Sequence, residues 1–289
     1  MNRIDLHLHS SYSDGKLGVV DLARHIKKAN LDYCALTDHD TVDGVLELNE
    51  CLKNTKTINI PAVELTVLHG EREIHILAYG FEVEKMSKLL LERTTIVNKK
   101  KIQELKKSIK LFRDNGFVVS DVIKVNPKQP VGLTIALDVY NNPENANKVA
   151  SLTPEQFYET YQAPGSLCYV ERSGVTLDWL IKKTRNLCQN LILAHPFNPV
   201  SFFVKPLSLD EIKKLILLGL DGIEVYHPGI NSQQVNLLKK FVLDHNLMWT
   251  GGSDFHSPIK QLFPLGYYDI NKRINSFKLY GYLQKNRTV

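Results

Sequence analysis

Short runs of apolar residues recur along the chain, and stretches with helical spacing separate most of them. The runs are rich in β-branched and other apolar residues, and they predict strands at residues 3–8, 33–37, 58–65, 73–80, 191–195, 221–226 and 248–252. Apolar residues three and four positions apart predict helices at residues 17–30, 176–190, 209–218 and 232–245, and another helix just after His39. This alternation indicates an α/β fold with a mainly parallel sheet, and seven strands favour a closed or nearly closed barrel.

Residues 84–113 interrupt the alternation with a long, lysine-rich helical pattern. Ile102, Leu105, Ile109 and Phe112 lie on one stripe of this pattern, which predicts an amphipathic helix. Prolines and short helical patterns fill the segment that follows, up to Gly165. We therefore expect residues 84–165 to form a mainly helical insertion over the mouth of a barrel built by residues 1–83 and 166–289.

The composition is that of an ordinary globular protein, with 43% hydrophobic and 23% charged residues in 289. No apolar run approaches the ~20 residues that cross a bilayer, and the N-terminus leads into a strand, so we expect a cytoplasmic protein without membrane contact. The four cysteines form no Cys-x-x-Cys pair and are interpreted as reduced structural thiols. Residues 85–113 hold ten basic and two acidic residues, which suits an anionic partner, although a solvated helix face is the more frequent explanation.

Histidines and carboxylates gather on or just beyond the predicted strands. Strand alternation places His7 and His9 on one face, where two imidazoles can bind one cation. The later members of the set are Asp38, His39, Glu64, His75, His195, Glu224, His227, Asp254 and His256. Taken singly, Asp14, Asp38, His75 and Glu224 are better explained as turn, cap or core residues. Taken together, so many buried ionisable groups would cost several kcal/mol per charge unless cations compensate them.

In chain order, the motifs His7-Leu8-His9, Asp14-Gly15, Thr37-Asp38-His39-Asp40, Glu64, His75-Ile76-Leu77, Ala194-His195-Pro196, Glu224 and Gly252-Ser253-Asp254-Phe255-His256 resemble those of the polymerase and histidinol phosphatase (PHP) superfamily. The resemblance runs from Met1 to about Pro264 and implies a distorted (β/α)7 barrel with a trinuclear metal centre. It implies one metal on His7, His9, Glu64 and Asp254, a second on Glu64, His75 and His195, and a third on Asp14, His39 and His256. Such mixed ligands suit up to three divalent ions of manganese, zinc or iron.

The implied reaction is hydrolysis of a phosphate ester by a hydroxide that bridges two of the cations. Glu64 would hold both of these cations, and Asp254 and His227 are candidate proton donors to the leaving oxygen. His227 is also a candidate contact for the substrate phosphate. Similar proteins often present a phosphate-binding arginine where Arg172 lies, because a guanidinium can hold two phosphate oxygens; a surface arginine without a role is the alternative. Glu224, like Asp38, is a candidate for orienting a ligand histidine.

The arrangement is most similar to stand-alone PHP phosphoesterases that act on nucleoside 3′,5′-bisphosphates or on the 5′ ends of short RNA. We therefore expect a phosphoric ester hydrolase with a phosphorylated small molecule, nucleotide or short oligonucleotide as substrate and no obligate protein partner. One departure is that the bisphosphate-acting members usually carry Arg followed by His at the start of a helix in the insertion. The corresponding stretch here, residues 131–136, has neither.

Three alternatives remain open at this point. A phosphatase for a small metabolite, such as histidinol phosphate, would carry the same metal ligands. A metal-binding but inactive nucleic-acid-binding or regulatory module is the second, although such domains typically lack several ligands and every expected position is filled here. An amidohydrolase is the third, and it usually needs a bridging lysine for which the chain offers no clear candidate.

Overall fold

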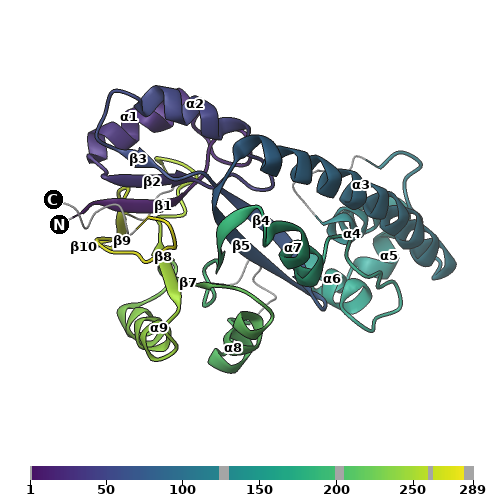
Figure 1. Ribbon diagram of the computed structural model, residues 1–289. Coiled ribbons are helices and arrows are strands. Elements are labelled where there is room, and N and C mark those ends of the chain that lie inside the picture. The colour runs from purple at the N-terminus through teal and green to yellow at the C-terminus, as the bar shows by residue number, and fades with distance from the viewer. Residues whose placement is uncertain (1, 124–129, 199–204, 260–262, 283–289) are drawn as a thin grey trace. The chain divides into compact units, whose positions relative to one another are not determined.

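A computed structural model describes residues 2–123, 130–198, 205–259 and 263–282 of the chain (Figure 1). The chain forms two compact units, one made of Met1–Leu91 with Thr176–Val289 and the other of Glu92–Val175. The division falls inside the long helix α3 (Val83–Asp114). Within these described ranges, no helix has both the length and the apolar character needed to cross a bilayer.

The first unit contains two principal sheets. The three-stranded sheet is parallel and comprises β1 (Ile4–Leu8), β2 (Tyr33–Leu36) and β3 (Ile58–Asn59) in that order. The five-stranded sheet comprises β4 (Ala62–His69), β5 (Arg72–Phe81), β6 (Cys188–Leu193), β7 (Gly222–Tyr226) and β8 (Met248–Gly251) in chain order. A small antiparallel pair joins β9 (Tyr267–Asp269) to β10 (Lys272–Arg273). With its helices, this unit has a mixed α/β architecture, as the sequence predicts.

Backbone hydrogen bonds connect the two sheets at two places. Just beyond β1, the amide of His9 donates to the carbonyl oxygen of Phe255, which follows β8, at 2.9 Å. Just beyond β2, the amide of Asp40 donates to the carbonyl oxygen of Glu64 in β4 at 2.8 Å. The segment after β1 therefore lies beside the segment after β8, and the segment after β2 lies beside β4.

The strands β4 and β5 depart from the expected alternation because they form an antiparallel hairpin. Gly70 and Glu71 connect them, and Gly70 adopts the left-handed region with φ of 61°. The predicted strand at residues 58–65 is wrong as a single element, because Pro61 lies between β3 and β4. Glu64 therefore lies near the start of β4, and not near the end of a strand as predicted. The next pair, β5 with β6, is also antiparallel.

Helices pack against these strands, and polar residues cap the later three of them. Helices α1 (Val19–Ala29) and α2 (Asp43–Leu52) pack beside β1, β2 and β3 (Figure 1), and their apolar residues form a buried core with residues of β1 and β2. The later helices are α7 (Leu177–Thr184), α8 (Leu209–Leu217) and α9 (Ser232–Asp244). Thr176, Ser208 and Asn231 cap these three helices with side-chain oxygens, which accept hydrogen bonds from otherwise unpaired amides. The predicted helix at residues 176–190 is too long, since α7 ends at Thr184 and β6 begins at Cys188.

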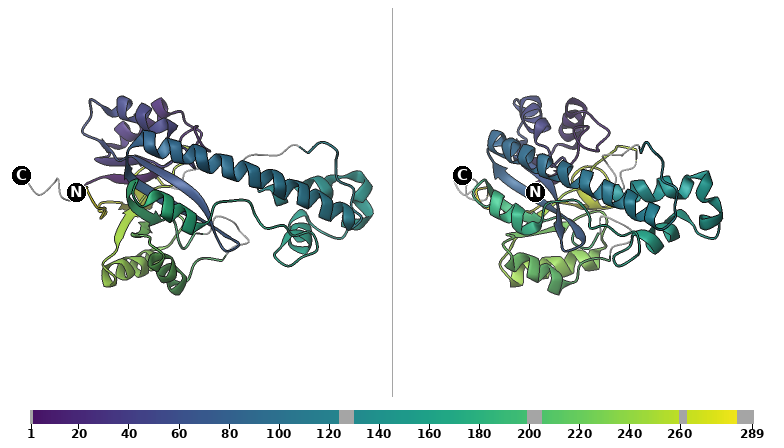
Figure 2. Two further views of the ribbon diagram at one scale, coloured as in Figure 1. Left: turned by 45° about the vertical axis from the view of Figure 1, so that its right-hand side comes forward. Right: turned by 90° about the vertical axis from the view of Figure 1, so that its right-hand side faces the viewer.

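The second unit contains its own core. Its helices are the part of α3 from Glu92 onward, α4 (Val131–Asn141), a short 3₁₀ turn at Pro143–Asn145, α5 (Ala146–Val149) and α6 (Pro154–Gln162), grouped near the end of α3 (Figure 2). Phe112, Phe117 and Phe157 are buried in this core, where the rings of Phe112 and Phe157 stack and the ring of Phe117 meets both edge-to-face. The apolar stripe predicted along the helix is only partly right, because Phe112 is buried whereas Ile102 is 56% exposed.

Candidate metal centre

Strand β1 presents polar side chains on one face and apolar ones on the other. Asp5, His7 and His9 share the polar face, and all three are fully buried. Asp5 accepts hydrogen bonds from the amides of Ser253 at 2.8 Å and Gly266 at 2.7 Å, which fixes the segment after β8 against β1. Burial raises the pKa of Asp5 to about 6, although these bonds oppose the shift. Sequence analysis missed Asp5, yet its alternation with the two histidines was a usable signal.

The first group of side chains brings together His7, His9, Glu64 and Asp254. Nε2 of His7 lies 3.1 Å from Oε2 of Glu64 and 3.3 Å from Oδ1 of Asp254. Nε2 of His9 lies 3.2 Å from the same oxygen of each carboxylate. Strand β1, strand β4 and the segment after β8 thus place four donor atoms around one point.

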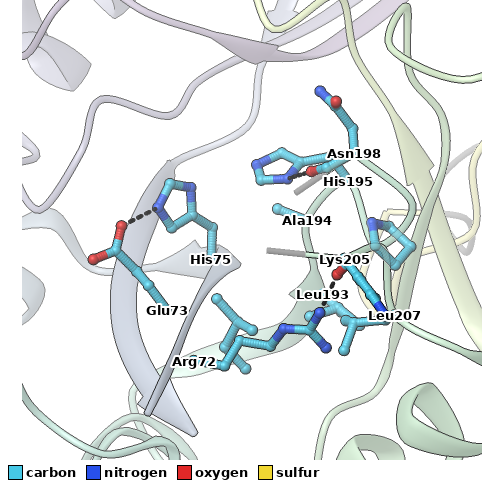
Figure 3. Close-up of a pocket in the computed structure, with 11 residues that line it drawn as sticks. Arg72, Glu73, His75, Leu193, Ala194, His195, Asn198, Lys205 and Leu207 are labelled. Atoms are coloured by element: carbon cyan, nitrogen blue, oxygen red, sulfur yellow. Dashed lines mark hydrogen bonds and ion pairs between the residues drawn. The ribbon is translucent and has the colours of Figure 1, made fainter. Parts of the chain in front are cut away.

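The second group surrounds the other oxygen of Glu64. Oε1 of Glu64 lies 2.8 Å from Nδ1 of His75 and 3.1 Å from Nε2 of His195. The hairpin explains the first contact, because Glu64 pairs with Leu77 and the diagonal neighbour two residues away is His75. His39 also approaches Glu64, with Nδ1 3.4 Å from Oε2. Figure 3 shows His75 and His195 on the wall of a cavity, with Glu73 beside the outer nitrogen of His75 at 3.8 Å.

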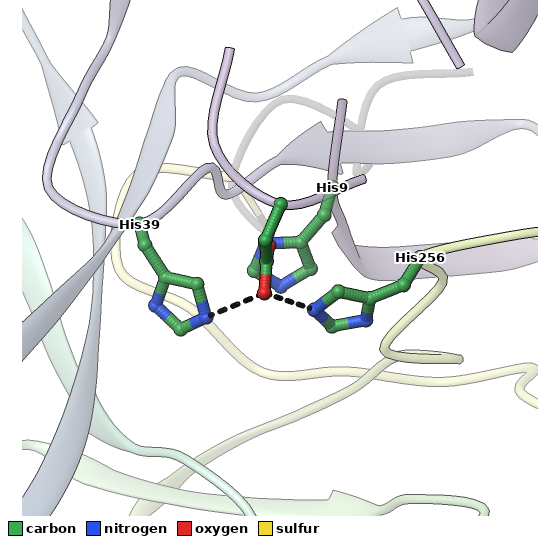
Figure 4. A group of neighbouring side chains, drawn as sticks. His9, His39 and His256 are labelled. Carbon is green, nitrogen blue, oxygen red and sulfur yellow. Dashed lines mark ion pairs between the residues drawn. The ribbon is translucent and has the colours of Figure 1, made fainter. Parts of the chain in front are cut away.

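The third group contains His9, Asp14, His39 and His256. Oδ2 of Asp14 lies 3.2 Å from Nε2 of His256 and 3.9 Å from Nε2 of His39, with the two rings on either side of this oxygen (Figure 4). The rings of His9 and His256 stack with centroids 4.2 Å apart. All nine predicted metal ligands consequently lie in one cluster centred on Glu64, and neighbouring groups share His9, His39 and Glu64.

Within the described part of the chain, several donor atoms of the cluster lack hydrogen bonds that a bound metal ion would replace. Neither ring nitrogen of His9 forms a hydrogen bond to a residue that the structure describes, and nor does Nδ1 of His39, although all three atoms are buried. Buried polar atoms without partners are costly, and a cation among imidazole nitrogens and carboxylate oxygens would satisfy them. Nitrogen and oxygen donors without a thiolate suit zinc, manganese or iron.

The charges within the cluster strongly alter its proton affinities. Burial would lower the pKa of His9 and His75, yet the neighbouring carboxylates raise these pKa values to about 9 and about 10. Burial instead prevails at His39 and, aided by the charges of His9 and His75, lowers its pKa to about 4. The histidines around Glu64 hold its pKa well below the ordinary value, even though burial opposes this shift. Without metal, protons therefore provide the positive charge that the carboxylates require.

The backbone segments that carry the cluster approach one another closely, and two of its residues have strained backbone conformations. A Cβ atom at Gly252 would lie 2.1 Å from Cβ of His7, and one at Gly15 would lie 2.5 Å from the carbonyl oxygen of His9. His195 has φ of 26° and Asp254 has φ of 48°, a region that costs a non-glycine residue about 1–3 kcal/mol. Such strain is typical of functional sites, where neighbouring bonds must hold the residue in place.

The loop between His9 and Asp14 is held by Asp38. Its carboxylate accepts hydrogen bonds from the amide of Ser10 at 2.7 Å and from the hydroxyls of Ser10 at 2.6 Å and Ser13 at 2.5 Å. Asp38 is therefore not the helix cap that it resembles in the sequence. Helix α2 begins five residues later, at Asp43.

The remaining predicted site residues have different surroundings. Glu224, on β7, contacts His7 and His195, and His227 lies 3.3 Å from Asp254. Arg172 belongs to the second unit, and its role at the site stays a prediction. Residues 131–136, which lack the Arg-His pair of the bisphosphate-acting proteins, form the first turns of α4, and this helix begins at Val131.

Curated relatives match this chain over nearly its full length. A 5′-3′ exoribonuclease of Haemophilus influenzae is 24% identical over 280 residues, which are 94% of each chain. A 3′,5′-nucleoside bisphosphate phosphatase of Chromobacterium violaceum is 24% identical and covers 89% of this chain and 88% of its own. A phosphoribosyl 1,2-cyclic phosphate 1,2-diphosphodiesterase of Eggerthella lenta is 22% identical, with 91% and 97% covered.

Solved structures share the fold. A proposed metal-dependent phosphoesterase of Bifidobacterium adolescentis superposes with a TM-score of 0.60 at 20% identity, covering 98% of this chain and 95% of its own. A Chromobacterium violaceum protein described as an amidohydrolase superposes with a TM-score of 0.61 at 21% identity, covering 94% and 93%.

Together, the cluster and the relatives define a metal-binding hydrolase of phosphate esters. The PHP domain family matches residues 5–164, which is more than half of the chain. The chain belongs to the PHP domain family.

Proposed function

We propose that this protein hydrolyses a phosphate ester of a nucleotide or short oligonucleotide at a centre of up to three divalent metal ions. The observation that carries the proposal is the position of Glu64, whose two oxygens lie within 3.4 Å of nitrogens from five histidines. A buried carboxylate with so many imidazole neighbours is suited to bridging two cations. The H. influenzae and C. violaceum relatives support the nucleotide or RNA substrate, because their names describe such activities.

The three groups of side chains suggest how the ions are divided. His7, His9, Glu64 and Asp254 would bind one ion, and Glu64, His75 and His195 would bind a second. Asp14, His39 and His256 would bind the third, with His9 close enough to contribute. The junctions between the two sheets are consistent with a distorted seven-stranded barrel, in which β1, β2 and β4 to β8 enclose the cluster.

The chemistry divides between the ions and the protein. When bound, the ions would supply a water of lowered pKa and positive charge for the phosphate oxygens. Glu64 and Asp254 would hold the reacting groups close together in a buried site, where electrostatic stabilisation is strong. Asp254, which is 26% exposed in its side chain, could also exchange a proton with the leaving oxygen. Arg172 would bind the phosphate of the substrate through two oxygens.

A phosphatase or phosphodiesterase for a small metabolite is the second candidate. The E. lenta relative favours it, because its name describes the cleavage of a phosphoribosyl cyclic phosphate. The missing Arg-His pair at the start of α4 is a further reason to test substrates other than bisphosphates.

The deciding experiment measures phosphate release or RNA shortening across a substrate panel, with manganese, zinc or iron supplied. The panel contains nucleoside 3′,5′-bisphosphates, 5′-phosphorylated RNA of two to five nucleotides, phosphoribosyl cyclic phosphate, histidinol phosphate and a carboxylic ester. A preference of at least tenfold in kcat/KM for the first two supports the proposal. A preference for phosphoribosyl cyclic phosphate or histidinol phosphate supports the second candidate, and turnover of the carboxylic ester alone would refute both.

A further inference from the structure

Strand β7 and the loop after it contribute two buried polar side chains to the cluster, Glu224 and His227, which are 0% and 3% exposed. Neither belongs to the three groups of prospective metal ligands. Both nevertheless contact members of those groups directly. We therefore ask how Glu224 and His227 affect the ligands that they contact.

The two oxygens of Glu224 accept hydrogen bonds from two different ligands. Nδ1 of His7 lies 3.0 Å from Oε1, and the backbone amide of His195 donates to Oε2 at 2.8 Å. A carboxylate only accepts hydrogen bonds, so Nδ1 of His7 must carry a proton. Nε2 of His7 is then the atom left to bind a cation, and it is the atom that faces Glu64 and Asp254.

The second bond acts on a strained residue. His195 holds φ of 26°, which a residue with a side chain rarely adopts. Two hydrogen bonds fix its backbone, one from its amide to Glu224 and one from the amide of Asn198 to its carbonyl oxygen at 2.8 Å. Since this backbone conformation aims Nε2 of His195 at Glu64, the bond to Glu224 supports the direction of a second ligand.

His227 is fixed in a similar way. The backbone amide of Gly229 donates to Nδ1 of His227 at 2.9 Å, so this nitrogen presents a lone pair. The hydrogen of the neutral ring must therefore be on Nε2, which lies 3.3 Å from Oδ2 of Asp254. His227 thus donates to one oxygen of Asp254 and leaves the other oxygen, Oδ1, facing His7 and His9.

We infer that Glu224 and His227 are a pair of positioning residues that orient three metal ligands, His7, His195 and Asp254, from one strand end. This inference rests on the proposed metal centre. It gives His227 a different role from that of proton donor or phosphate contact. Partners that orient metal ligands typically contribute 10- to 100-fold to metal affinity.

The test measures the affinity of metal-free protein for zinc alone, by competition with a chromogenic chelator and without substrate. An amide offers one acceptor oxygen, so Glu224→Gln should lose one of the two bonds and about tenfold in affinity, and Glu224→Ala about 100-fold. Glu224→Asp keeps the charge and should restore part of the loss. Asn190→Ala is the control, because it removes two partly buried hydrogen bonds between β6 and the backbone of Tyr280 outside the cluster. It should lower thermal stability and leave zinc affinity unchanged.

His227 is tested by comparing two variants. Glutamine can present an N–H group but cannot release a proton, so His227→Gln should retain zinc affinity within about threefold, and His227→Ala should lose at least tenfold. If both variants bind zinc normally and lose kcat equally, His227 acts as a proton donor and the positioning role is refuted. Glu64→Ala distinguishes a failure of the positioning pair from a failure of the proposed metal centre. If only Glu64→Ala lowers zinc affinity, the positioning pair is wrong and the metal centre stands; if no variant does, the metal centre itself fails.

Discussion

The contact between Gly252 and His7 predicts that Gly252→Ala will disrupt the metal centre. The added Cβ would lie 2.1 Å from Cβ, 2.5 Å from N and 2.7 Å from Cα of His7, whereas ordinary contact begins at 3.4 Å. The segment after β8 would have to move away from β1 by about 1.3 Å or more, since backbone atoms cannot rotate aside. Asp254 lies only two residues further along, so the same movement would separate it from His7 and His9.

The size of the effect follows from this displacement. Overpacking against backbone costs about 3 kcal/mol, at the upper end of the usual range, which corresponds to a decrease in Tm of about 6–12 °C for a chain of this size. A displacement of ~1 Å in reacting groups costs on the order of 100-fold in rate. Differential scanning fluorimetry, metal analysis and kcat/KM on the best substrate of the panel would measure the three quantities.

Gly18→Ala is the matched control, because a Cβ there would meet no atom within 4 Å and Gly18 has φ of −65°. Its cost should stay below about 1 kcal/mol, since the only change is at the start of α1. The reasoning is refuted if Gly252→Ala keeps its metal content and activity within about threefold of the unmodified protein. Equal losses in both variants would also count against it.

The remaining predictions concern charge. Glu64→Ala should remove at least two bound ions and lower kcat by more than about 1000-fold, measured by metal analysis and phosphate release; full activity would exclude bridging by this residue. Zinc affinity should rise between pH 7 and pH 9, because the raised pKa values of His9 and His75, about 9 and about 10, mean that protons must leave before metal binds. Calorimetry in buffers of different ionisation enthalpy would count those protons. His9 and His75 should contribute their full stabilisation to the metal-free protein below about pH 6.5, and this contribution should be lost as pH rises through 9 to 10, which thermal unfolding of the wild type and of a variant lacking both histidines would measure. Arg172→Ala should raise KM about tenfold with little change in metal content, and an unchanged KM would exclude Arg172 from substrate binding.

The periodicity of apolar residues was sufficient to predict most strands and helices of the first unit. It failed at β4 and β5, where a hairpin turn takes the place of the expected helical crossover. The two-residue connection between β4 and β5 is too short for a parallel crossover, and Gly70 was a local signal of the turn. Pro61 likewise marked the division of the predicted third strand. Each signal is a single residue, and the pattern of alternating apolar runs does not take single residues into account.

The gathering of histidines and carboxylates at one place was also predictable, because strand ends bring distant segments together. Their pairwise contacts were not. Asp38 resembled a helix cap in the sequence, yet it holds the loop that carries Asp14 through Ser10 and Ser13. The bond from the amide of His195 to Glu224 depends on the backbone conformation of His195, which no pattern of residue types encodes.

The bonds from Asp5 to Ser253 and Gly266 have a consequence for biosynthesis. Asp5 and Ser253 are 248 residues apart in the chain, so β1 leaves the ribosome long before the segment that completes its polar face. At about 5–20 residues per second, the delay is roughly 10–50 s. During that interval His7 and His9 have no partner from the region of Asp254, and a complete set of ligands exists only once nearly all of the polypeptide has been translated. The group formed by His7, His9, Glu64 and Asp254 can therefore be complete only late in synthesis, after its first three members have been exposed on the nascent chain.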